Sequence, residues 1–87
     1  QAVLSALPFH CNIRVAELAL KAKVHYFDLT EDVETSKRVH DLSKDAPVCF
    51  MPQCGLAPGF ISIAAAHLIR SLDSVEAVKM RVGALPI

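Results

Sequence analysis

Apolar and polar positions divide the chain into short apolar runs and longer segments with helical periodicity. The apolar runs predict buried β-strands over residues 1–7, 24–29 and 48–51. The segments that follow repeat apolar residues at helical spacing and predict helices over residues 12–22, 33–44 and 58–72. Residues 75–82 end in strict alternation of polar and apolar side chains, which predicts a half-exposed strand.

This order of elements predicts an α/β fold with a parallel sheet. Because helices of about ten residues separate the strands, right-handed crossovers are the expected connections. The chain has no G-x-G-x-x-G turn for a cofactor phosphate. A half-domain of parallel strands without that turn is typical of the second half of a Rossmann-type sheet, which meets the nicotinamide.

The change of pattern after Asp73 indicates a domain boundary. We expect residues 1–73 to form the C-terminal half of a Rossmann-type NAD(P)-binding domain. Residues 74–87 are then expected to enter a different sheet. Since the phosphate-binding half would lie elsewhere, we expect the isolated chain to be inactive.

Composition and charge indicate which classes of partner, among protein, nucleic acid, membrane and metal, the chain favours. A hydrophobic fraction of 53% indicates elements covered on both faces, or surface that another piece of protein hides. Nine basic and nine acidic residues without a basic block argue against nucleic acid. The longest apolar-rich stretch, residues 58–72, is too short for a membrane span. The three cysteines lack the spacing of a metal site and favour a reducing, cytoplasmic compartment.

Ligands of parallel sheets lie outside the carboxyl ends of the strands, so those ends carry the candidate residues. After the first strand, Ser5 and small neighbours would let a planar ring approach the backbone, although a strand-to-helix turn capped by Asn12 explains them equally. After the second strand come the carboxylates of Asp28, Glu31 and Asp32. They favour either helix capping or acid–base chemistry.

The third strand end, residues 52–59, has two prolines and two glycines, which serve a fixed backbone. A helix starting there would point free amide groups at an anion or a polarised carbonyl. Cys54 is either a nucleophile or a small packing residue, and no base nearby supports the first interpretation.

Four short motifs in order carry a resemblance that covers essentially the whole chain. They are Ser5-Ala6-Leu7-Pro8-Phe9, His25-Tyr26-Phe27-Asp28-Leu29-Thr30, Gly55-Leu56-Ala57-Pro58-Gly59 and Gly83-Ala84-Leu85-Pro86. The ordered set resembles the saccharopine dehydrogenase-like family, which includes saccharopine reductases and lysine 6-dehydrogenases. Each motif alone is weak, whereas the set is fairly specific.

The resemblance implies an NAD(P)-dependent oxidoreductase that transfers hydride at an amine-bearing carbon of an amino acid. It further implies that residues 74–87 begin a second, α+β domain for substrate binding and dimerisation. The chain would then work with the remainder of the same enzyme, as a homodimer. The residues it places along the cofactor, or beside cofactor and substrate, are Ser5, Ala6, Leu7, Pro8, Thr30 and Glu31. The loop it places at the reacting centre comprises Gln53, Cys54, Gly55, Leu56, Ala57, Pro58 and Gly59.

One departure bears on the substrate. In saccharopine reductases the loop looks like Gly-Leu-Asp-Pro-Gly followed by Ile-Asp-His, whereas here Ala57 replaces the first acid, and Ile61 and Ser62 stand at the Asp-His pair. The lysine 6-dehydrogenase branch therefore fits better than saccharopine dehydrogenase. The same departures leave a second hypothesis open, a non-catalytic Rossmann-like module for assembly or regulation. The choice between NAD and NADP is set outside this half.

Overall fold

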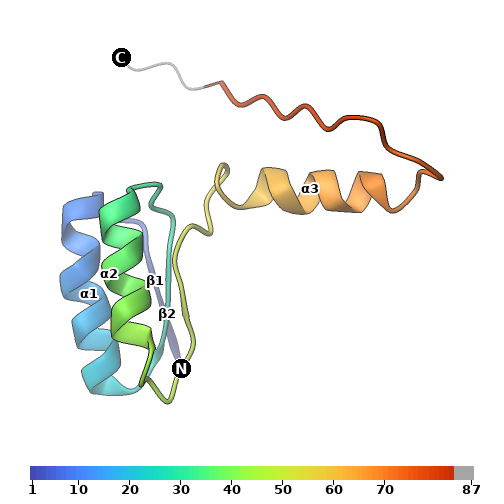
Figure 1. Ribbon diagram of the computed structural model, residues 1–87. Helices are drawn as coiled ribbons and strands as arrows, with labels where there is room; N and C mark the ends of the chain where they lie inside the picture. Colours follow the sequence, from blue (N-terminus) through green and yellow to red (C-terminus); the bar gives the residue numbers. More distant parts are fainter. Residues whose placement is uncertain (84–87) are drawn as a thin grey trace.

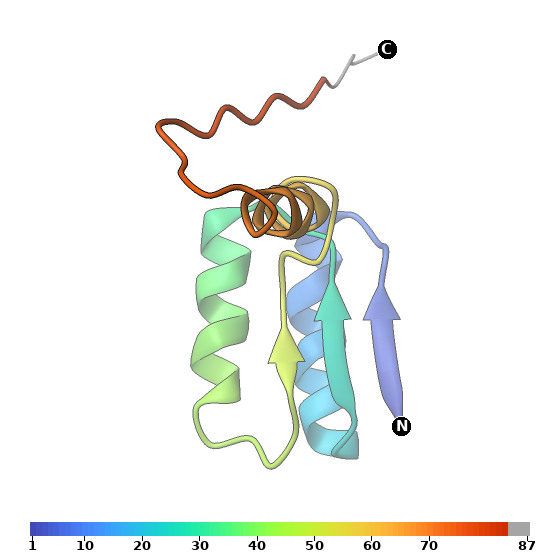
Figure 2. The same ribbon diagram turned by 90° about the vertical axis from the view of Figure 1, so that its right-hand side faces the viewer.

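Three short strands, paired in parallel in the order β1-β2-β3, organise the computed structural model of the chain, which describes residues 1–83. Their arrows point the same way in Figure 2. With three helices they form a small α/β fold, as predicted (Figure 1). In chain order the elements are β1 Ala2–Ser5, α1 Phe9–Ala22, β2 His25–Asp28, α2 Val33–Ser43, β3 Phe50–Met51 and α3 Phe60–Ile69.

Both α1 and α2 lie on one face of the sheet (Figures 1 and 2). Successive right-handed crossovers in the same direction place their helices on the same side. The buried apolar core between these helices and the sheet consists of Ala16, Ala19, Tyr26 and Val39. The two alanines let α1 approach the strands closely, and the Tyr26 ring stacks on Phe50 with centroids 5.5 Å apart.

The opposite face of the sheet is uncovered by the described residues. Leu4, Phe27 and Met51 stand opposite one another across the three strands. Leu4 is 63% exposed and Met51 49% exposed. The expectation of strands covered on both faces is therefore wrong for residues 1–83, because neither crossover brings a helix to this side.

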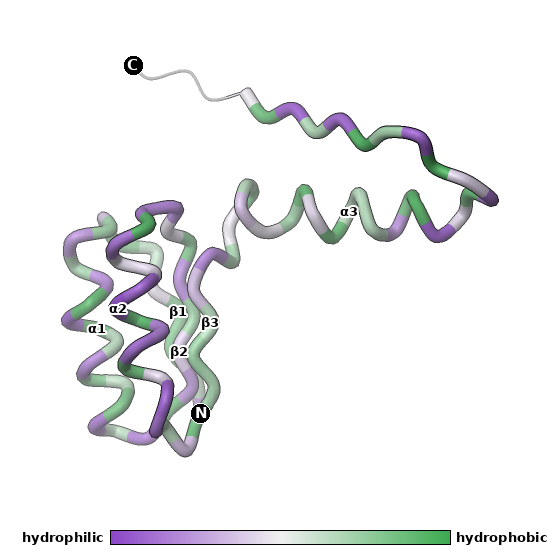
Figure 3. The backbone as a smooth tube through the Cα atoms, in the orientation of Figure 1, coloured by the Kyte–Doolittle hydropathy of each residue, from purple (hydrophilic) through white to green (hydrophobic). Residues whose placement is uncertain are grey.

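Helix α3 extends away from the sheet, and none of its residues is buried (Figures 1 and 3). Residues 70–83 turn back alongside it, and the two segments line a groove of about 340 Å³. The strand predicted over residues 75–82 is wrong for the described residues, because this segment is exposed and pairs with no strand among residues 1–83. Of the closing Gly83-Ala84-Leu85-Pro86 motif, the residues after Gly83 lie outside the described part of the chain.

The starts of α1 and α2 test two capping hypotheses. Asn12 does not cap α1, which begins at Phe9 after Pro8; the amide lies inside the helix and is 1% exposed. Asp32 does cap α2, since its carboxylate accepts a hydrogen bond from the Thr35 amide at 2.8 Å. That bond lowers the pKa of Asp32 below its ordinary value.

The core predicts that substitutions of two valines of α2 differ in their effect on the free energy of unfolding. Val39 is fully buried, whereas Val33 is 79% exposed. Val39→Ala should lower the free energy of unfolding by about 2 kcal/mol, because it removes buried methyl groups and leaves a cavity. Val33→Ala should be nearly neutral. Urea denaturation followed by circular dichroism measures both, and equal effects would contradict this core.

Candidate functional site

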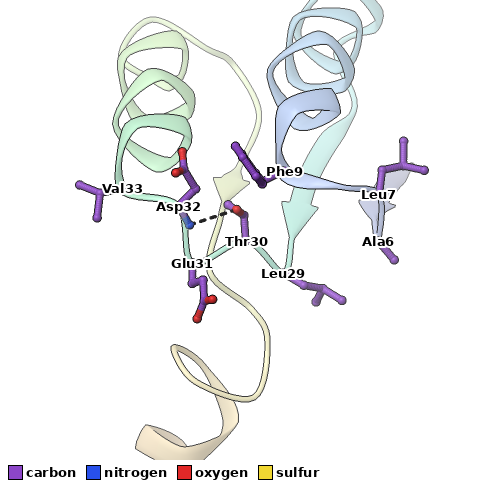
Figure 4. A pocket seen from close by; sticks show the side chains of 8 residues that line it. All are labelled: Ala6, Leu7, Phe9, Leu29, Thr30, Glu31, Asp32 and Val33. Atoms are coloured by element: carbon purple, nitrogen blue, oxygen red, sulfur yellow. Dashed lines mark hydrogen bonds between the residues drawn. The ribbon is translucent and has the colours of Figure 1, made fainter. Parts of the chain in front are cut away.

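The carboxyl edge of the sheet carries a groove of about 710 Å³, called here the edge groove. It lies between the starts of α1 and α2, where the Thr30 hydroxyl accepts a hydrogen bond from the Asp32 amide at 3.2 Å (Figure 4). The residues that line it are Ala6, Leu7, Phe9, Leu29, Thr30, Glu31, Asp32 and Val33. Two separate connections of the chain thus build one groove.

The structure brings together most of the residues predicted to lie beside a cofactor. Ala6 and Leu7 come from the connection after β1, and Thr30 and Glu31 from the connection after β2. Ser5 does not line the edge groove, since its side chain is buried and its Oγ donates to Asn12 Oδ1 at 2.7 Å. Pro8 is also outside the lining and stands at the N-cap of α1.

The predicted substrate-side loop lines a second hollow, of about 420 Å³, called here the loop groove. Its walls are Met51, Pro52, Gln53, Cys54, Gly55, Gly59, Phe60 and Ile63. Leu56, Ala57 and Pro58 belong to the same loop but do not line it. The predicted loop thus borders a hollow, and the fold selects which of its residues face it.

One buried carboxylate, that of Asp28, connects the two grooves. It is fully buried at the end of β2, and its Oδ2 accepts from the Tyr26 hydroxyl at 2.8 Å. Its Oδ1 accepts from the amides of Thr30 at 3.0 Å and Gln53 at 3.2 Å. Its backbone carbonyl accepts from the Cys54 amide at 2.8 Å. Asp28 thereby holds one residue of the edge groove and two of the loop groove.

The sequence did not predict that Asp28 joins the two grooves. Tyr26 entered only as part of a motif, with no structural role of its own. Tyr26 and Asp28 are two residues apart on a strand, so their side chains point to the same face. The Tyr26 hydroxyl also lies 3.3 Å from the Asn12 carbonyl oxygen. The available signal was a tyrosine followed two positions later by an acid in an apolar strand, a pattern that indicates a buried polar pair.

The carboxylates of Asp28, Glu31 and Asp32, at the carboxyl end of β2, have distinct structural roles. Asp28 is fully engaged inside the fold, and Asp32 caps α2. Glu31 is exposed and lines the edge groove. The capping interpretation is therefore confirmed for Asp32, and Glu31 is the exposed one of the three carboxylates.

The start of α3 does not offer the free amides that the sequence predicted. The amides of Phe60 and Ile61 donate to the carbonyls of Gly55 and Leu56 at 2.8 and 2.9 Å. The amide of Ser62 donates to the Gly59 carbonyl at 3.1 Å. The loop itself thus satisfies these donors, and the expectation of an anion or carbonyl site there is wrong.

Burial and charge set the proton states around Asp28. Burial raises the pKa of Tyr26 above its ordinary value, and the hydrogen bond to Asp28 and its charge add to the effect. Burial also raises the pKa of the Cys54 thiol, helped by the charge of Asp28 and by Cys49. A thiol that holds its proton is a poor nucleophile. This supports the interpretation of Cys54 as a packing residue, with its sulfur 3.3 Å from the Met51 carbonyl oxygen.

Residues 1–83 contain no group of three or more histidine, cysteine or acidic side chains that could hold a metal ion. None of their helices has the length and apolar character needed to cross a membrane. No family model matches the chain, and no solved structure matches it.

The raised pKa of Tyr26 predicts an alkaline transition. The folded state holds the phenol proton more tightly than the unfolded state, so this stabilisation is complete below about pH 10 and is lost as the pH rises above it. Tyr26 is the only tyrosine, and tryptophan is absent. Ultraviolet absorbance should therefore show phenolate only as circular dichroism reports unfolding. Tyr26→Phe should abolish the signal; phenolate appearing near pH 10 in folded protein would contradict the burial.

Proposed function

We propose that the chain forms the nicotinamide-side half of a Rossmann-type domain in an NAD(P)-dependent oxidoreductase. The reaction is hydride transfer at an amine-bearing carbon of an amino acid, as in lysine 6-dehydrogenases. The observation that carries the proposal is the edge groove. Two motifs that resemble the family, about twenty residues apart in the chain, contribute Ala6, Leu7, Leu29 and Thr30 to one hollow at the carboxyl edge of a parallel sheet.

The lining of the edge groove suits a nicotinamide better than a phosphate. Its volume of about 710 Å³ falls within the range of small-molecule sites. Ala6 and Leu7 offer an apolar wall to a planar ring. The carboxylates of Glu31 and Asp32 would repel a phosphate but accept hydrogen bonds from ribose hydroxyls. The cofactor, when bound, would supply the hydride acceptor, and these residues would hold and orient it.

Thr30 offers a further polar contact. Its Oγ1 accepts from the Asp32 amide, which leaves the hydroxyl proton to donate to a ligand. Its own amide is held by Asp28 at 3.0 Å, so the donor is fixed in place. An oriented donor beside an apolar wall is suited to the carboxamide of nicotinamide.

Nicotinamide mononucleotide tests the proposal on the chain itself. In a titration of the ¹⁵N-labelled protein, saturable shifts are expected at the amides of Ala6, Leu7, Thr30 and Glu31, and adenosine monophosphate should leave them unchanged. Ala6→Leu should weaken binding by filling the groove, whereas Ala2→Leu, at the other end of β1, should not. Identical responses to both nucleotides, or none at millimolar concentration, would remove the support for a nicotinamide site.

A second candidate function, a non-catalytic module for assembly, has its own supporting observation. The uncovered row Leu4, Phe27 and Met51 is an apolar surface of the kind found at protein interfaces. Under this function the chain should self-associate in light scattering, and Leu4→Glu should restore a monomer. Lys21→Glu on the exposed surface of α1 is the control. A monomeric chain that binds nicotinamide mononucleotide would exclude it.

A further inference from the structure

Gln53 adopts a backbone conformation that its residue type disfavours. Among the described residues, Lys23 and Gln53 are the non-glycine residues with positive φ, at 55° and 64°. Lys23 closes α1, where its amide bonds to carbonyls of the last turn, and such helix ends commonly take this conformation. Gln53 follows β3 and ends no helix. Its strain therefore has no explanation in secondary structure.

Asp28 holds this strained backbone in place. The Gln53 amide donates to Asp28 Oδ1 at 3.2 Å, and the next amide, that of Cys54, donates to the Asp28 carbonyl oxygen at 2.8 Å. Strained residues persist where such contacts over-determine them, and they cluster at ligand sites. Both bonds use backbone groups, so glycine at position 53 would make them with less strain. The glutamine side chain must then have another use.

The surroundings of the Gln53 side chain favour a cation. It lines the loop groove, and the hydrogen bonds found among residues 1–83 involve its backbone amide but not its carboxamide. Met51, Phe60 and Ile63 give the groove apolar walls. The buried carboxylate of Asp28 lies next to this groove, because its Oδ1 accepts from the amide of Gln53, a lining residue, at 3.2 Å. A groove with apolar walls and a nearby negative charge suits an ammonium group at the end of an alkyl chain.

We propose that the Gln53 carboxamide oxygen accepts a hydrogen bond from the side-chain ammonium of a lysine-like amino acid whose methylene stem lies in the loop groove. The choice of ligand rests on the proposed function, and the inference adds the residue that recognises it. Gln53 is then a residue that determines specificity, and Asp28 positions it.

Two matched ligands test the contact. L-lysine and L-norleucine have side chains of similar length, but only lysine carries the terminal ammonium. In a titration of the ¹⁵N-labelled chain, lysine should shift the Gln53 side-chain amide and the Cys54 backbone amide in a saturable way. Norleucine should shift them far less. Equal shifts, or no response to lysine at tens of millimolar, would overturn the proposal.

Two matched variants separate recognition from structure. Gln53→Gly and Lys23→Gly should each raise the melting temperature by about 3 °C, the net of relieved strain and the greater chain entropy of glycine. Only Gln53→Gly should weaken lysine binding, by about tenfold for one lost hydrogen bond. Gln53→Glu should strengthen it, because a carboxylate attracts the ammonium more strongly.

These measurements distinguish the two proposals. A Gln53→Gly variant that binds lysine as the unchanged chain does would overturn the role of Gln53, even if nicotinamide mononucleotide still binds the edge groove. Failure of the nucleotide alone, with the lysine contact intact, would overturn the dehydrogenase proposal and leave an amine-binding loop.

Discussion

The buried carboxylate of Asp28 is the constraint on which the carboxyl edge of the sheet depends. A charge removed from water must be compensated by hydrogen bonds. Three donors compensate it here, from Tyr26, Thr30 and Gln53, and they belong to β2 and to the two connections that follow β2 and β3. Loss of any one donor would leave the carboxylate underbonded. The edge is therefore assembled as a unit around one side chain.

This constraint explains why such short strands hold a defined edge. The ladder between β2 and β3 involves only two registered pairs, Tyr26 with Phe50 and Phe27 with Met51. Asp28 extends that pairing beyond the ladder, because it binds the Gln53 and Cys54 amides just after β3. The Asp28 side chain thus bonds the chain just after β3 ends. It joins the loop groove to the edge groove, because it binds the amides of both Gln53 and Thr30.

The remainder of the fold is one-sided. Helices α1 and α2 cover one face of the sheet around Tyr26 and Val39, while Leu4 and Met51 remain exposed on the other. Helix α3 leaves the sheet with an apolar surface that no described residue buries. The hydrophobic excess in the composition is accounted for by these surfaces, which agrees with the idea of surface that another piece of protein hides.

The sequence by itself determined the order of elements, because apolar runs and helical spacing are local properties. Chain order alone assigned the segments that hold Ala6, Leu7, Thr30 and Glu31 to the carboxyl ends of parallel strands, and these residues line the edge groove. Their place beside a cofactor is what the resemblance implies and stays a prediction. The family resemblance has no counterpart in the comparisons and stays a hypothesis. The sequence did not determine where α1 begins. Asn12 lies within this helix, where its side-chain oxygen accepts a hydrogen bond from Ser5. A local pattern does not reveal that contact, because Ser5 is seven positions earlier in the chain.

Only the tertiary structure decided which polar residues meet. Asp28 and Gln53 are 25 positions apart in the chain, so their hydrogen bond exists only once β3 has paired with β2. The same is true of the face on which the crossovers place their helices. It is also true of residues 75–82, whose alternation favours a strand but which pair with no strand in the described part of the chain. Periodicity reflects the secondary structure that one segment favours. Burial, strand pairing and charge compensation depend instead on the contacts that the segment makes with the rest of the chain.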